Sequence, residues 1–72
     1  MGTKNNPGKY DCYAKADPDE PIFILRANDP SAPLLVRTWC ELNGPHTNMA
    51  KLMEAYNCAD AMEQWRREKH GG

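Results

Sequence analysis

The feature that most constrains the fold is a short chain without an evident covalent or metal support. Its 72 residues form at most one domain. Such a domain buries only about 60% of its unfolded surface, so disulfides, a metal or self-association usually stabilise it. The chain has three cysteines, Cys12, Cys40 and Cys58. Their odd number and the absence of a Cys-x-x-Cys pair argue against a disulfide framework and against a zinc knuckle. We therefore expect a homo-oligomer or a partner surface.

The charge and hydropathy of the chain limit the kinds of molecule that it is expected to bind. Nine basic residues oppose ten acidic ones, whereas a protein that neutralises many phosphates normally has a basic excess. No run approaches the ~20 apolar residues of a membrane span, and the first residues are polar, unlike a signal peptide. Unpaired cysteines fit a reducing compartment. We predict a cytoplasmic protein (in the host cytoplasm if it is phage-encoded) that binds neither nucleic acid nor membranes.

The first part of the chain predicts a short β element. Residues 1–9 are polar and read as a flexible arm, and residues 10–70 as one small domain. The segment from Tyr10 to Ala14 fits a brief strand or a turn. Ile22–Leu25 is apolar, partly β-branched and bounded by turn signals, which predicts a strand at 22–27, with an irregular core segment as the alternative. A lone strand leaves its backbone unpaired, so it must pair with the Tyr10 segment or with its own copy in a second subunit.

A first helix is predicted over residues 31–43. Asp29 or Ser31 would cap its start, with Pro33 favouring Ser31, and Asn43-Gly44-Pro45 would end it. An amphipathic helix buries the side chains that recur every three or four residues. The residues predicted to share the apolar face are Leu35, Trp39 and Leu42, widened by Val36 and Cys40 and opposed by Arg37 and Glu41.

A second helix is predicted over about 48–68, with an apolar surface too wide for one neighbouring helix. Its early stripe, expected to pack on the first helix, is Met49, Leu52, Tyr56 and Ala59; its later stripe, expected to meet another surface, is Cys58, Met62 and Trp65. Tyr56, Met62 and Trp65 are the predicted interface residues, because large aromatic side chains are enriched at interfaces. The alternative is that Trp65 folds back onto the strand or the arm. The predicted fold is α+β and mostly helical, a short β element followed by an antiparallel two-helix hairpin.

Catalytic equipment is sparse. Asp17, Asp19 and Glu20 lie among prolines in an expected surface loop, and no motif surrounds His46 or His70. The chain has no P-loop and no Gly-x-Gly-x-x-Gly turn after a strand. We predict a protein that is not an enzyme and has no cofactor and no metal.

One candidate ligand site lies where the predicted strand leads into the first helix. A helix N-terminus offers unpaired N–H groups and a partial positive charge, so Ser31 and Ala32 would face an anion there. Arg26 would add bidentate hydrogen bonds to a phosphate, and Arg37 would supply a second arm, from the same chain or from a neighbouring subunit. Against this, Pro30 and Pro33 remove donors and Asp29 adds a negative charge. An ion pair of Arg26 with Asp29 or Asp19 is the alternative.

The stretch from Asp19 to Trp39 (DEPIFILRANDPSAPLLVRTW) resembles a group of short uncharacterised proteins encoded by bacteria and their phages. The pattern is DEPxFxLRxxDPxAPxxVRxW, with further similarity at 9–14 and 59–65. The resemblance implies a prokaryotic or viral accessory protein that acts by binding. We predict a non-enzymatic anti-defence factor that sequesters a phosphorylated nucleotide signal. The alternative is an inhibitor or adaptor that binds a host protein through the apolar face of the second helix.

Overall fold

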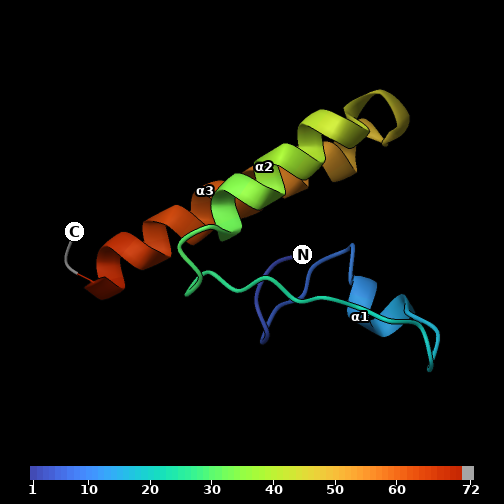
Figure 1. Cartoon of the computed structure of the whole chain (residues 1–72), viewed down its shortest axis with the longest axis horizontal. Coiled ribbons are helices and arrows are strands. Elements are labelled where there is room, and N and C mark those ends of the chain that lie inside the picture. Colours follow the sequence, from blue (N-terminus) through green and yellow to red (C-terminus); the bar gives the residue numbers. More distant parts are fainter. Residues whose placement is uncertain (71–72) are drawn as a thin grey trace.

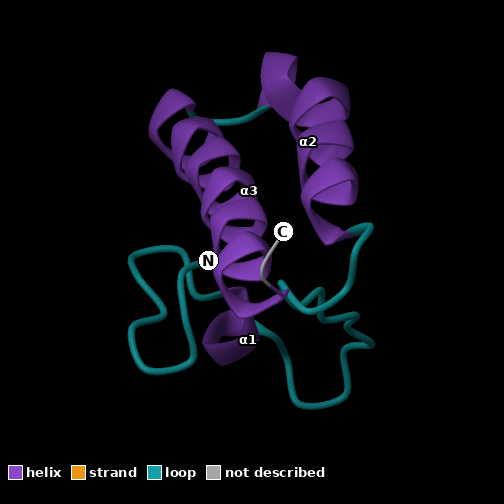
Figure 2. Ribbon diagram, turned by 90° about the vertical axis from the view of Figure 1, so that its left-hand side faces the viewer, coloured by secondary structure: helices purple, strands orange, loops and turns teal. Residues whose placement is uncertain are grey.

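The computed structural model describes residues 1–70, and its regular elements are all helical. They are α1 (Cys12–Lys15), α2 (Ala32–Asn43), the 3-10 turn η1 (Gly44–His46) and α3 (Met49–His70). α2 and α3 pack side by side in opposite directions, and α3 extends past the start of α2 (Figure 1). Residues 1–30, with α1, lie along one side of this hairpin (Figures 1 and 2). The mostly helical class and the helical hairpin are therefore confirmed.

The predicted strand at 22–27 is wrong, because residues 1–70 contain no strand. The expected partner segment forms α1 instead: the Asp11 side chain caps it by accepting a hydrogen bond from the Ala14 N–H at 3.2 Å. With that segment helical, residues 21–26 have no neighbour inside the chain to share a ladder of backbone hydrogen bonds. Ile22 and the two residues after it are exposed, and only Leu25 is half-buried.

Local signals fix the ends of the two long helices to within two residues of the predicted bounds. Pro33 lies in the first turn of α2, where its missing N–H costs no hydrogen bond. Gly44 has φ −50°, so it continues in helical geometry into η1 rather than forming a left-handed cap. Asn48 precedes α3 and accepts the Ala50 N–H on its side-chain oxygen at 2.7 Å.

Small side chains form the interface between α2 and α3. The buried core consists of Ala32 and Cys40 from α2 and Ala55 and Ala59 from α3. Helix axes approach more closely where the side chains between them are short, so this row of small residues brings the two backbones together. Burial also raises the pKa of the Cys40 thiol, which keeps it neutral.

The predicted inner face of the first helix is consequently wrong in part. Cys40 is buried and Val36 is half-buried, but Leu35, Trp39 and Leu42 all remain exposed. The early stripe of the second helix is also only partly inside: Ala59 is buried, whereas Met49 is 69% exposed. The hairpin buries its smallest side chains and leaves large apolar ones at the surface.

Residues 1–9 lie against this hairpin. The Met1 amino group donates to the carbonyl oxygen of Tyr10, and the Lys51 ammonium from α3 lies 5.9 Å from the centre of the Tyr10 ring. A Cβ at Gly8 would come within 3.0 Å of a Glu54 carboxylate oxygen on α3. The flexibility expected of this arm stays a prediction.

Candidate functional site

A groove of about 830 Å³ lies between α3 and the first third of the chain. Its volume falls in the range of about 300–1,000 Å³ that is usual for small-molecule sites. We call it the Trp65 groove. Its lining residues come from the arm (Gly2, Thr3, Lys4), α1 (Tyr13), the extended segment (Ile24, Leu25, Arg26, Ala27) and α3 (Cys58, Ala61, Met62, Trp65).

The later stripe of α3 supplies one wall of this groove. Cys58, Met62 and Trp65 recur at spacings of four and three, so they lie on one face of the helix. Trp65 lines the groove together with residues of the arm and residues 24–27, and 40% of its surface remains exposed. The Lys69 ammonium lies 5.8 Å from the centre of the Trp65 ring. The groove therefore offers an accessible aromatic surface.

The lining of the groove also includes a cationic residue. Arg26 lines the groove and is exposed, and no carboxylate within residues 1–70 lies close enough to form an ion pair with it. The turn that follows is fastened to α3, because Arg66 donates a hydrogen bond to the Asn28 carbonyl oxygen at 2.6 Å. Lys4 from the arm adds a second cation. Two cations and an indole thus share one concave surface.

The start of α2, by contrast, has a carboxylate of the protein's own beside it. Asp29 accepts hydrogen bonds from the Ser31 N–H at 2.9 Å and the Ser31 hydroxyl at 2.7 Å. These two hydrogen bonds, that of the hydroxyl first, lower the pKa of Asp29 and keep it ionised. Ala32 is buried, and its N–H donates to the Asp29 carbonyl oxygen. Neither Ser31 nor Ala32 lines the Trp65 groove, so the structure separates them from Arg26.

Asp29→Ala is expected to lower the melting temperature at neutral pH, because it removes both hydrogen bonds to Ser31. A carboxylate with a depressed folded-state pKa stabilises the fold above its unfolded pKa of about 3.9 and loses this effect as the pH falls through the lower folded value. The difference from the parent protein should therefore shrink below about pH 4. Thermal unfolding followed by circular dichroism across the acid range measures it, with Asp19→Ala as the control. A difference that is independent of pH would contradict the assignment.

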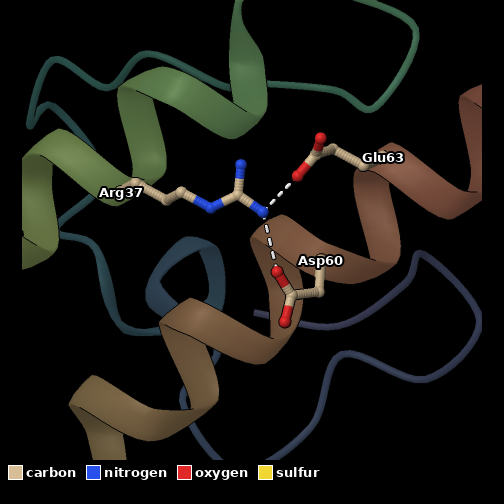
Figure 3. Close-up of polar contacts among 3 residues, drawn as sticks. All are labelled: Arg37, Asp60 and Glu63. Atoms are coloured by element: carbon tan, nitrogen blue, oxygen red, sulfur yellow. Dashed lines mark hydrogen bonds and ion pairs between the residues drawn. The ribbon is translucent and has the colours of Figure 1, made fainter.

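Arg37 lies between α2 and α3, outside the groove. Its guanidinium pairs with Asp60, at 2.7 Å, and with Glu63 (Figure 3). Hydrogen bonds to Asp60 and then Glu63 raise the pKa of Arg37 above its ordinary value. This bridge links the middle of α2 to α3. Arg37 is thereby engaged by two carboxylates of its own chain and is not brought to Arg26.

The remaining expected site residue, Tyr56, is half-buried and does not line the groove. Sequence reasoning missed Lys4 and Tyr13, because only the packing of the arm and α1 against α3 brings them there. A smaller pocket of about 260 Å³ adjoins the groove through Leu25. Lys51 lines it, with its ammonium 5.8 Å from the Trp39 ring centre.

No family model, curated protein or solved structure matches the chain. Within residues 1–70, no group of three or more His, Cys, Asp or Glu side chains is arranged to hold a metal ion. None of the helices described is sufficiently long and apolar to traverse a bilayer.

Proposed function

We propose that the protein is a small, non-enzymatic binding protein that holds a phosphorylated nucleotide in the Trp65 groove. The observation that carries this proposal is the pairing of an accessible indole with an unpaired guanidinium across one groove. A nucleotide has the matching halves, a flat base and an anionic phosphate.

Each half of the ligand has a partner in the groove. A base stacked on an aromatic side chain gains about 1–3 kcal/mol, so Trp65 would hold the base, with Met62 and Ile24 covering its edges. Arginine binds phosphate through two parallel N–H···O hydrogen bonds, and Lys4 would add a point charge. This arrangement moves the predicted phosphate position from the start of α2 to the groove, while keeping Arg26 as its main ligand.

Binding without turnover lowers the concentration of the free nucleotide. By analogy with very small phage proteins that sequester a nucleotide signal, we propose an anti-defence role for the complex. The charged residues that line the groove, Lys4 and Arg26, are both cations, which suits retention of an anion.

Isothermal titration calorimetry with a panel of linear and cyclic nucleotides tests the proposal. At least one nucleotide should bind in the micromolar range. Arg26→Ala should weaken this binding by about ten- to a hundredfold, since a hydrogen bond to a charged group contributes about 1.5–3 kcal/mol.

Arg67→Ala is the matched control for this experiment, because Arg67 is an exposed arginine of α3 that does not line the groove. It should leave the affinity unchanged. Absence of binding by the whole panel, or equal affinities for the two variants, would overturn the nucleotide site.

A protein partner is the second candidate, and the exposed apolar side chains favour it. On α3 the expected anchors Met62 and Trp65 line the groove, whereas α2 exposes Leu34, Leu35 and Leu42. An inhibitor or adaptor acting through this surface would lose its complex on Leu42→Asp and keep nucleotide binding. Loss of the same complex on Trp65→Ala alone would place the partner on α3 instead.

A further inference from the structure

The extended segment before α2 has an unpaired backbone. Within residues 1–70, the N–H and C=O groups of Ile22, Phe23, Ile24 and Leu25 form no hydrogen bond with any other group of the chain. Nearly all backbone groups in folded proteins are paired with protein or water, and an extended segment with free groups is a template for another strand. This segment therefore has the means to accept a strand from outside.

Its side chains also favour such a pairing. Phe23 is 85% exposed, more than any other large apolar side chain described in the structure, and both neighbouring isoleucines are exposed as well. Isoleucine and phenylalanine are enriched in strands because they pack well across a pleated surface. In water these side chains have no packing partner, whereas opposite a second strand they would pack in cross-strand pairs.

We propose that a second copy of this chain pairs with the first through residues 22–24, antiparallel about a two-fold axis at Phe23. In this register the two Phe23 side chains lie opposite each other, and Ile22 of each copy lies opposite Ile24 of the other. The same register places Glu20 opposite Arg26 of the second copy at both ends, so a second copy and a nucleotide compete for the Arg26 guanidinium. Opposite charges across a strand pair stabilise it, so the segment is complementary to itself.

Pro21 selects the hydrogen-bonding phase of this pair. Antiparallel residue pairs alternate between those that exchange two N–H···O bonds and those that exchange none. Pro21, which lies opposite Leu25, has no N–H and so belongs in a non-bonded pair, which makes Phe23 non-bonded too. The bonded pairs are then Ile22 with Ile24 of the second copy, and the reverse. Side chains approach more closely in non-bonded pairs, which suits contact between the phenyl rings.

This register makes a residue-specific prediction for amide hydrogen exchange, measured by NMR on the full chain without nucleotide. At high protein concentration the Ile22 and Ile24 amides should exchange at least about tenfold more slowly than the Phe23 amide, which points away from the partner. On dilution this protection should disappear. Rapid exchange at all three positions, or protection that is independent of concentration, would overturn the proposal.

Charge reversal tests the two ends of the pair. Glu20→Lys and Arg26→Glu should each abolish the protection, because each places like charges opposite one another. The double variant restores opposite charges and should regain protection within about tenfold of the parent protein. A double variant no better than the single ones would contradict the register. Nucleotide binding has no part in this readout, so failure here is distinguishable from failure of the Trp65 groove.

Discussion

Ala59→Leu is expected to lower the free energy of unfolding of the protein by a large fraction. Ala59 is 0% exposed and lies in the row of small side chains where α2 and α3 meet. Adding three carbons there forces the helices apart, and overpacking of a closed core typically costs about 1–3 kcal/mol. A domain of this size has only about 3–5 kcal/mol of stability from its core, so the loss is a large fraction of the total.

Urea unfolding followed by circular dichroism measures this effect. Ala61→Leu is the matched control, because Ala61 lies two residues further along the same helix and is exposed. Its free energy of unfolding should stay within about 0.5 kcal/mol of the parent value, with an unchanged midpoint. Equal midpoints for the two variants would contradict the close approach of α2 and α3.

Trp65→Ala should weaken nucleotide binding by about 5- to 150-fold, which corresponds to the loss of about 1–3 kcal/mol of base stacking. The expectation follows from the position of Trp65 in the lining of the groove, which it shares with Arg26. Calorimetry with the tightest-binding nucleotide of the panel measures it, and circular dichroism verifies that the helices remain folded.

Trp39→Ala provides the control for the loss of an indole. Trp39 is 38% exposed, close to the 40% of Trp65, but it lies on α2 and lines the smaller pocket. The Trp39→Ala variant should bind the nucleotide with the same affinity as the parent protein. A loss of similar size in both variants would indicate a general effect on the fold and would contradict stacking on Trp65.

The helices were predictable because their signals are local. Pro33 at the start of α2, Gly44-Pro45 at its end and Asn48 before α3 act through hydrogen bonds and dihedral angles within a few residues. The absence of the strand predicted at 22–27 could not be foreseen, because a strand forms only where a partner, often distant in the sequence, pairs with it. Ile22–Leu25 has the composition of a strand, but Asp11 caps a helical turn in the segment that would have paired with it.

The inner face of α2 was mispredicted for a related reason. The spacing of Leu35 and Trp39 is as regular as that of Val36 and Cys40, so periodicity predicts an apolar surface wider than one partner covers. The alanines of α3 decide which part is buried, because Ala55 and Ala59 allow a close approach only to small residues. Which residues of α2 are buried therefore depends on the side chains of both helices together.

The candidate site was predictable only in its parts. Arg26 and Trp65 are a cation and an aromatic residue that composition singles out, but their meeting in one groove requires the turn at Asn28 to be fastened to α3 by Arg66. Arg37 was expected beside the ligand, and its two carboxylate partners lie more than twenty residues away in the sequence. Ion pairs of this separation carry no local signal.

Together the small core and the exposed large side chains indicate that one copy does not cover its own apolar surface. Four small residues make up the buried apolar core, while Phe23, Leu34 and Leu42 are mostly exposed. Burial of apolar surface is the dominant stabilising term in folding, and a chain of this length has little of it to spare. We therefore expect association with a second copy to contribute to the stability of the fold.

Sedimentation equilibrium of the unmodified chain, from micromolar to millimolar concentration, tests this expectation most directly. The weight-average mass should rise from that of one chain, 8.2 kDa, towards twice that value, with Phe23→Asp remaining at the lower mass throughout. A parent protein that keeps the mass of a single chain at every concentration would contradict the account.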